Sequence, residues 1–299
     1  MNQPLVSNVS DTARWVAVYR AWESARPDAL FRDPFAERLA GERGPAIARM
    51  MPGQARSGWP IIIRTKLIDD LILSSLADGC DCVVNLAAGL DTRPYRMALP
   101  SSLQWIEVDL PAMVEEKQRL LADVRPVCRL SWRGLDLSET AARAALVDEF
   151  ADNARKTLVI TEGLLVYLEE AVVRALALDL RNRAGIRWWI FDLASPNLLR
   201  LMQSTMGAQL SNAPMKFAPA NGVAFLEALG WTAADIRPLL REAARLHRLP
   251  LFLRPFVLFP EPDPRRLGNA RWSAVIRLKA DGAAADVSRR GAGGPDHSR

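Results

Sequence analysis

The chain has 299 residues, 49% of them hydrophobic and 24% charged, so it can form one large α/β domain with an insertion or two small domains. Because no uncharged apolar run reaches about 18 residues and the N-terminus lacks a secretory signal, we expect a cytoplasmic protein that does not bind membranes. The net charge of the chain is +5. The excess of basic residues is local to 237–279, a stretch with nine arginines and one lysine but only three carboxylates. Since few of these arginines alternate with aromatic residues, we expect no nucleic-acid partner.

Few residues can ligate a transition metal or support histidine-based catalysis. Cys80, Cys82 and Cys128 form no Cys-x-x-Cys pair, and of two histidines only His247 lies outside the C-terminal tail. We therefore expect no disulfide framework and no metal site. Ser-His-Asp or Cys-His catalysis would depend on His247 alone, with no nucleophile elbow near it.

The first part of the chain is expected to be helical. Residues 10–51 show helical spacing of apolar residues, with breaks at Pro27, Pro34 and Gly41. A link rich in proline, glycine and serine follows at 52–60, and then a second amphipathic helix at 61–76, in which Arg64 takes a polar position. We assign residues 1–60 to a helical N-terminal cap.

From residue 80 onward, short β-rich runs alternate with helical stretches, which is typical of βαβ units and a mostly parallel, doubly wound sheet. Strands are expected at 82–86, 103–108, 127–135, 157–161, 187–193 and 272–278, with an edge region after Gly230. Helices are expected at 95–98, 111–123, 139–153, 169–182 and 222–229. We predict a catalytic domain at 61–280 with a lid insertion around 196–221, and a disordered tail at 281–299.

The loop after the first strand indicates a nucleotide-like cofactor. Ligands of open α/β sheets bind beyond the carboxyl ends of the strands, and Gly89 would let the backbone approach such a ligand closely. The G-x-G-x-x-G fingerprint is missing, and Asp91 would repel a pyrophosphate, which disfavours NAD and FAD. S-adenosylmethionine, which has a positive sulfonium and no phosphate, fits this loop better.

A second acidic residue ends the next strand. Asp109 lies 20 residues after Gly89, where a carboxylate can accept hydrogen bonds from both hydroxyls of a ribose. Aspartate is also a favoured N-cap, and Pro111 is a favoured first helical residue. The role of a helix cap therefore stays open for Asp109.

Three ordered motifs carry a family resemblance. They are Asn-Leu-Ala-Ala-Gly-Leu-Asp-Thr-Arg-Pro-Tyr-Arg at 85–96, Glu-Val-Asp-Leu-Pro at 107–111 and Thr-Glu-Gly-Leu-Leu-Val-Tyr-Leu at 161–168. Together they resemble the leucine carboxyl methyltransferase family, including its bacterial polyketide O-methyltransferases of the tetracenomycin type, from about Thr12 to the last strand. The resemblance implies a class I methyltransferase fold, Rossmann-like with seven strands, and S-adenosylmethionine as cofactor. One departure is Ala87, where many relatives have glycine, and we expect its methyl group to narrow the turn.

The resemblance also implies roles for individual residues. Arg64 would bind the carboxylate of the methionine moiety, Gly89 would lie under that moiety and Asp109 would hold the ribose. Asp136 and Leu137 would contact the adenine through a carboxylate and a backbone group. For Arg64, an exposed or ion-paired surface position is the alternative.

Two further residues lie in or after the predicted fourth strand. The resemblance places Glu162 near the amino group of methionine, and burial of its carboxylate without a cation would cost several kcal/mol. Pairing with an arginine is the structural alternative for Glu162. Tyr167 is the candidate catalytic residue, as an orienter of the acceptor, with a core position as the alternative.

These features predict an O-methyltransferase that acts on a carboxylate or acidic hydroxyl of a small molecule, with polyketide-like acceptors included. A carboxylate is ionised at neutral pH and needs no general base. The alternatives are a protein C-terminal carboxyl methyltransferase, a nicotinamide-dependent oxidoreductase and a module that binds the cofactor without turnover. The sequence names neither the acceptor nor the oligomeric state.

Overall fold

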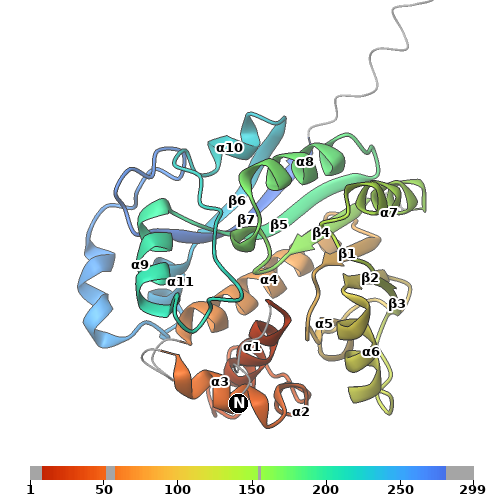
Figure 1. Ribbon diagram of the computed structural model, residues 1–299, viewed down its shortest axis with the longest axis horizontal. Coiled ribbons are helices and arrows are strands. Elements are labelled where there is room, and N and C mark those ends of the chain that lie inside the picture. The colour runs from red at the N-terminus through yellow and green to blue at the C-terminus, as the bar shows by residue number, and fades with distance from the viewer. Residues whose placement is uncertain (1–8, 52–57, 154–155, 281–299) are drawn as a thin grey trace, which may run out of the picture.

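One seven-stranded sheet organises the chain (Figure 1). The computed structural model describes residues 9–51, 58–153 and 156–280, so the predicted tail at 281–299 lies outside the described residues. The strand order is β3-β2-β1-β4-β5-β7-β6, in which β1 to β5 are parallel and β7 is antiparallel to both of its neighbours. The strands are β1 (Cys82–Leu86), β2 (Gln104–Asp109), β3 (Arg129–Gly134), β4 (Thr157–Thr161), β5 (Ile186–Ala194), β6 (Trp231–Pro238) and β7 (Ser273–Ala280). The predicted mostly parallel α/β sheet is confirmed.

Helices cover both faces of this sheet and one of its ends (Figure 1). They are α1 (Val9–Ser24), α2 (Ala36–Ala40), α3 (Arg43–Met50), α4 (Trp59–Ala77), α5 (Arg93–Arg96), α6 (Pro111–Leu120), α7 (Thr140–Asn153), α8 (Glu170–Arg181), α9 (Pro196–Met206), α10 (Ala224–Glu227) and α11 (Leu239–Arg245), with 3₁₀ turns η2 (Leu165–Tyr167) and η3 (Leu251–Leu258). None of the helices in the described ranges is long and apolar enough to cross a bilayer. The division into cap, catalytic domain and lid stays a prediction.

Alternating side chains of the central strands feed two separate cores. Val83 and Val84 are adjacent in β1 and fully buried, yet they belong to different hydrophobic clusters, because successive side chains of a strand point to opposite faces. Helices α4 and α11 contribute to the cluster that contains Val83. Helices α7, α8 and α10 contribute to the cluster that contains Val84. Central strands buried on both faces explain why β1 and β4 are continuous apolar runs.

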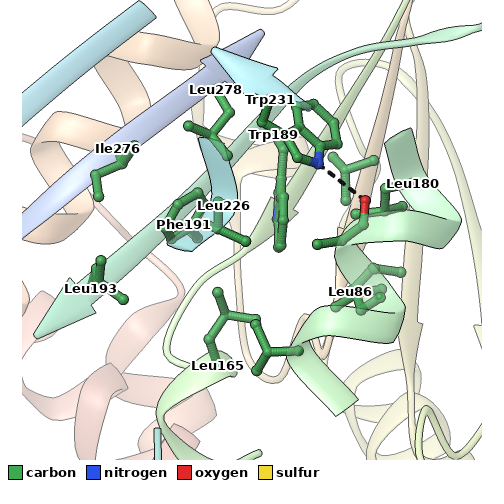
Figure 2. Packing of buried hydrophobic residues seen from close by; sticks show 14 of the residues in the cluster. Leu86, Leu165, Leu180, Trp189, Phe191, Leu193, Leu226, Trp231, Ile276 and Leu278 are labelled. Atoms are coloured by element: carbon green, nitrogen blue, oxygen red, sulfur yellow. Dashed lines mark hydrogen bonds between the residues drawn. The ribbon is translucent and has the colours of Figure 1, made fainter. Parts of the chain in front are cut away.

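A group of aromatic residues packs among aliphatic side chains in the second of these cores (Figure 2). Trp189 packs against Phe191 and Trp231, with ring centroids 4.9 Å and 5.6 Å apart. The indole nitrogen of Trp231 donates a hydrogen bond of 3.0 Å to the carbonyl of Ala177, which ties the edge strand β6 to α8. Leu165 is 1% exposed in the same cluster and so anchors η2, the turn that carries Tyr167.

Several boundaries differ from those expected. The edge region after Gly230 is strand β6, and the next residues form α11, which was not predicted although its sequence is rich in leucine, alanine and arginine. Helix α10 covers only 224–227 of the predicted 222–229. Strand β3 starts at Arg129 rather than at residue 127, because the backbone N–H of Val127 donates to the carbonyl of Pro94, outside the sheet.

The turn after β1 is strained at one residue. Ala87 has a φ of 54°, in the left-handed region that a side chain disfavours by about 1–2 kcal/mol. We expect Ala87→Gly to raise the free energy of unfolding by about 0.5–1 kcal/mol, since glycine removes this strain at a smaller cost in chain entropy. Urea unfolding of both proteins would measure the difference. Ala88→Gly is the control and should destabilise, because Ala88 is not in the left-handed region. A less stable Ala87→Gly variant would contradict the assignment of strain.

Candidate active site

A large cavity lies at the carboxyl ends of the parallel strands. Its volume is about 1250 Å³, above the roughly 300–1,000 Å³ of most ligand pockets, so it has room for two ligands at once. Its walls include residues of α1, α4 and α9 as well as the loops after β1 to β4. The structure brings all seven candidate residues into its lining: Arg64, Gly89, Asp109, Asp136, Leu137, Glu162 and Tyr167.

Asp109 joins the loops that follow β1 and β2. Its carboxylate accepts hydrogen bonds from the backbone N–H of Gly89 at 2.6 Å and of Leu110 at 2.7 Å. Burial raises the pKa of Asp109, and these two donors offset only part of the increase. Each oxygen can still accept a further bond, for example from a hydroxyl. The helix-cap alternative is wrong, because Leu110 is the N-cap of α6 and no side chain caps that end.

Gly89 could not be replaced by a larger residue without strain. Its φ is +50°, and a Cβ placed there would lie 3.1 Å from the Cβ of Ala13 in α1. Helix α1 therefore closes over the loop after β1, and the missing side chain of Gly89 keeps the backbone accessible from the cavity.

The loop after β3 offers one carboxylate and one fixed backbone segment. Asp136 is exposed and accepts a hydrogen bond of 2.9 Å from the backbone N–H of Ser138, a contact that lowers its pKa. The buried Arg143 donates to the carbonyl of Leu137 at 3.0 Å. This bond holds Leu137 beside the cavity.

Arg64 and Glu162 form an ion pair at the cavity wall. Nε of Arg64 lies 3.0 Å from Oε1 of Glu162, and Nη1 of Arg64 lies 3.2 Å from Oδ2 of Asp192. The side chain of Arg64 is only 16% exposed, so Arg64 is not solvated but ion-paired, and its role toward the methionine carboxylate stays a prediction. Burial disfavours the charge of Arg64, but Asp192 and Glu162 outweigh it and raise its pKa.

Glu162 also contacts a second arginine. Its Oε2 lies 2.8 Å from Nη1 of Arg93, a residue that is 1% exposed. Burial would raise the pKa of Glu162, but Arg93 and Arg64 together hold it below the usual value. Two guanidinium groups therefore compensate the charge of Glu162, which is the pairing with arginine considered as its structural alternative, and its role toward the ammonium group of methionine stays a prediction.

Arg93 is the centre of a larger buried network. Its Nε lies 2.6 Å from Asp69 and its Nη1 lies 2.8 Å from Asp91, while the backbone N–H of Arg93 donates to Asp91 at 2.9 Å. Arg96 shares Asp69, at 2.7 Å. We call the following residues the Arg93 cluster: Arg64, Asp69, Asp91, Arg93, Arg96, Glu162 and Asp192.

Tyr167 lies at the end of η2 and lines the cavity. It also packs against the apolar cluster that includes Leu199 and Met215 and is half-buried, while its role as an orienter of the acceptor stays a prediction. Burial raises the pKa of Tyr167, and a hydrogen bond with the side chain of Thr12 in α1 only partly opposes this. The phenol therefore stays protonated near neutral pH, where it can donate a hydrogen bond but cannot act as a base.

Comparison with known proteins agrees with this arrangement. Leucine carboxyl methyltransferases match the chain over residues 13–180, which span α1 to α8 and contain every candidate residue of the cavity. The chain belongs to the leucine carboxyl methyltransferase family.

Relatives of this methyltransferase occur in actinobacteria. A Streptomyces coelicolor protein, provisionally named an S-adenosyl-L-methionine-dependent methyltransferase, is 34% identical over 262 residues, 83% of this chain and 91% of its own. A Frankia alni protein of the same name is 34% identical over 260 residues, 82% of this chain and 89% of its own. The predicted enzyme class and cofactor, a methyltransferase that uses S-adenosylmethionine, are confirmed.

Solved structures share the fold at low sequence identity. A DUF574 family protein from Streptomyces avermitilis superposes with a TM-score of 0.56 at 13% identity, over 90% of this chain and 96% of its own. A Thermobifida fusca protein gives 0.54 at 14% identity, over 92% and 96%. The class I methyltransferase fold is thus confirmed.

The charges of the cavity suit the cofactor of this methyltransferase. Among the described residues, the lining contains four arginines (Arg20, Arg64, Arg241 and Arg271) and six carboxylates (Asp91, Asp109, Asp136, Glu162, Asp192 and Glu261). The balance is negative, whereas S-adenosylmethionine has a net positive charge from its sulfonium, ammonium and carboxylate groups. Electrostatic complementarity of this kind favours a cation. The residues present therefore fit the cofactor.

Two residues of this site were not predicted from the sequence. Asp192 accepts a hydrogen bond of 2.6 Å from the backbone N–H of Gly163 and also faces Arg64, so it connects β5 to the loop after β4. It lies close to the end of an expected strand, where the rule used for Asp109 could have found it. Arg93 had no such signal, because its partners Asp69 and Glu162 are distant in the sequence.

We expect Asp109→Ala to weaken the binding of S-adenosylhomocysteine by about 1.5–3 kcal/mol, the usual range for hydrogen bonds to a charged group. The reason is the loss of the acceptor that also fixes Gly89. Isothermal titration calorimetry would measure the loss of binding free energy. Asp123→Ala is the matched control, because Asp123 is exposed and does not line the cavity. Unchanged affinity in Asp109→Ala would leave its carboxylate with a purely structural role.

Proposed function

We propose that this S-adenosylmethionine-dependent methyltransferase acts on oxygen, with a small molecule whose carboxylate or acidic hydroxyl is already ionised at neutral pH. The observation that supports this is the state of the titratable groups around the cavity. Within the described ranges, neither lysine nor histidine lines it, and Tyr167 stays protonated. Four of the six lining carboxylates, Asp91, Glu162, Asp192 and Glu261, are each paired with an arginine, and the other two lie in the loops that this proposal assigns to the cofactor.

An acceptor that is ionised on its own removes the need for a general base. The remaining task of the protein is to align the acceptor oxygen with the methyl group, and positioning of this kind can contribute roughly 7–11 kcal/mol to barrier lowering. When bound, S-adenosylmethionine supplies a methyl group on a positively charged sulfur. In this proposal Tyr167 donates a hydrogen bond to the acceptor and so orients it.

The proposal assigns the cofactor to the loops after β1 to β4. Asp109 holds the ribose, Asp136 and Leu137 contact the adenine, and Gly89 leaves space for the methionine moiety. Glu162 attracts the ammonium group, and Arg64 has the charge required by the methionine carboxylate. Since Arg64 already contacts Glu162 and Asp192, the three side chains bind the two charged ends of methionine as one unit.

Transfer of labelled methyl groups tests the proposal. The enzyme is incubated with methyl-labelled S-adenosylmethionine and fractionated metabolites or proteins, and the labelled product is treated with mild base. A methyl ester of a carboxylate is hydrolysed, whereas a methyl ether survives. Label in a polyketide-like small molecule is expected, and label at the C-terminus of a protein would instead support the protein carboxyl methyltransferase alternative.

The pH dependence of the reaction gives a second test. With a carboxylate acceptor the rate should stay level from about pH 6 to 9, because the acceptor is ionised throughout and no base titrates. With an acidic hydroxyl the rate should rise through the pKa of that hydroxyl. A bell-shaped profile on a carboxylate acceptor, or label on nitrogen or carbon, would contradict the proposal.

A further inference from the structure

The cavity continues well past the residues assigned to the cofactor, into a region bounded by α9 and η3. We propose that this region binds an extended apolar chain of the acceptor, so that the substrate is an amphiphile with an ionised head and a long apolar tail. This inference rests on the proposed function, because it takes the same cavity as the acceptor site. We call the region the apolar arm and define it by Leu201, Met202, Met206, Leu253, Phe256 and Phe259.

One wall of the apolar arm is a stripe of α9. Leu198, Leu201, Met202 and Met206 recur at helical spacing, and all four line the cavity. They are only half-buried, whereas Gln203 and Ser204 on the other side of the helix are exposed. Met202 and Met206 also pack against the buried cluster that includes Leu199, so the stripe lies between this core and the cavity, and its methionines can adapt to ligands of varied shape.

The opposite wall is a stripe of the 3₁₀ segment. With three residues per turn, Leu253 and Phe256 fall on one face of η3, and Phe259 follows directly after its end; all three line the cavity. Leu253 packs against the core, but Phe256 and Phe259 are 57% and 65% exposed, with ring centroids 6.4 Å apart. This light-blue segment lies at the periphery in Figure 1, beside α9 and α11. Exposed aromatic rings at a cavity mouth suit an apolar ligand that would cover them.

Charged groups near the apolar arm are already engaged. Arg241 donates to Glu261 at 2.6 Å and to the carbonyl of Phe259 at 3.0 Å, so this arginine ties the end of the segment to α11. The part of the cavity lined by the loops after β1 to β4 contains the charged groups of Arg64, Glu162 and Asp109. A ligand that satisfies both ends must therefore be polar at one end and apolar at the other.

Straight-chain fatty acids with 6 to 16 carbons serve as probes, titrated by calorimetry into the enzyme saturated with S-adenosylhomocysteine. Affinity should rise about fourfold per added methylene, the value expected for burial of one CH₂, until the apolar arm is full. Met206→Lys, which places a charge in the apolar arm, should abolish the increase of affinity with chain length. Phe256→Ser should remove it for the longest chains only, because Phe256 lies at the mouth.

Leu258→Ser is the matched control. Leu258 belongs to the same segment and is 88% exposed, but it does not line the cavity, so fatty-acid affinity should not change. Affinity independent of chain length, or an equal loss in Leu258→Ser and Phe256→Ser, would overturn the proposal. So would a wild-type dimer in sedimentation that Phe256→Ser dissociates, since the exposed rings would then contact a second copy. Failure of S-adenosylhomocysteine itself to bind would instead contradict the proposed function.

Discussion

Arg93→Gln is expected to lower the free energy of unfolding by about 3–5 kcal/mol, the usual cost of removing one partner from a buried ionic network. Arg93 is 1% exposed, and its guanidinium contacts Asp69, Asp91 and Glu162. Without it, these carboxylates would lose the cation that they share. Chemical denaturation followed by circular dichroism would measure the loss.

Two variants make this result specific. Arg93→Lys should give a smaller loss, since it keeps the charge but not the planar fork that reaches several carboxylates. Arg133→Gln breaks an exposed pair with Glu149 and should change stability by less than about 1 kcal/mol. If Arg93→Gln were as mild as Arg133→Gln, the Arg93 cluster would not be a source of stability.

The loss of unfolding free energy in Arg93→Gln should also depend on pH. Burial would raise the pKa of Asp91, but Arg93 and neighbouring cations hold it below its usual value. In the wild-type protein, Asp91 therefore contributes to the free energy of unfolding above about pH 4, and this contribution is lost as the pH falls further. In the variant, burial dominates and the folded-state pKa rises above the unfolded value. Stability of the variant then improves as the pH falls. The difference in unfolding free energy between wild type and Arg93→Gln should therefore become smaller from pH 7 towards pH 4.

Glu162→Gln is expected to reduce the affinity for S-adenosylmethionine by about 10- to 100-fold, because it removes the carboxylate proposed to attract the ammonium. It should also lower the stability of the ligand-free protein by about 1–3 kcal/mol, since the bonds to Arg64 and Arg93 are weakened. The loss stays moderate because each arginine keeps another carboxylate, Asp192 or Asp91.

Thermal melts of both proteins, with and without S-adenosylmethionine, separate the two effects. Glu261→Gln is the control. Glu261 lines the same cavity and is also paired with an arginine, Arg241, but it does not belong to the loops assigned to the cofactor. A Glu162→Gln protein that melts lower than wild type, yet gains as much from the cofactor, would leave Glu162 with a structural role alone.

The strands and the strand-end residues could be predicted from the sequence because both depend on local pattern. Buried apolar runs mark β1 and β4, and chain order together with parallel pairing places Gly89, Asp109 and Glu162 at one edge of the sheet. The structure brings these residues into one cavity, while their roles remain proposals.

The Arg93 cluster could not be predicted, because it depends on tertiary contacts. Asp69 lies within the amphipathic helix expected at 61–76, yet it is buried against Arg93 and Arg96. The partners of Glu162 come from α4 and from the loop after β1, which no local pattern connects. Ala87 likewise gave no sign of its left-handed backbone beyond the departure from glycine.

The position of β7 has a consequence for biosynthesis. This strand is made last among those described, yet it lies between β5 and β6 and is the neighbour with which β6 pairs. Until the ribosome has completed Ser273–Ala280, the edge of β5 is open and exposes backbone donors and acceptors beside Trp189 and Phe191. The unpaired edge of β5 is therefore the place where an incomplete chain can pair with other chains, and the synthesis of β7 closes it.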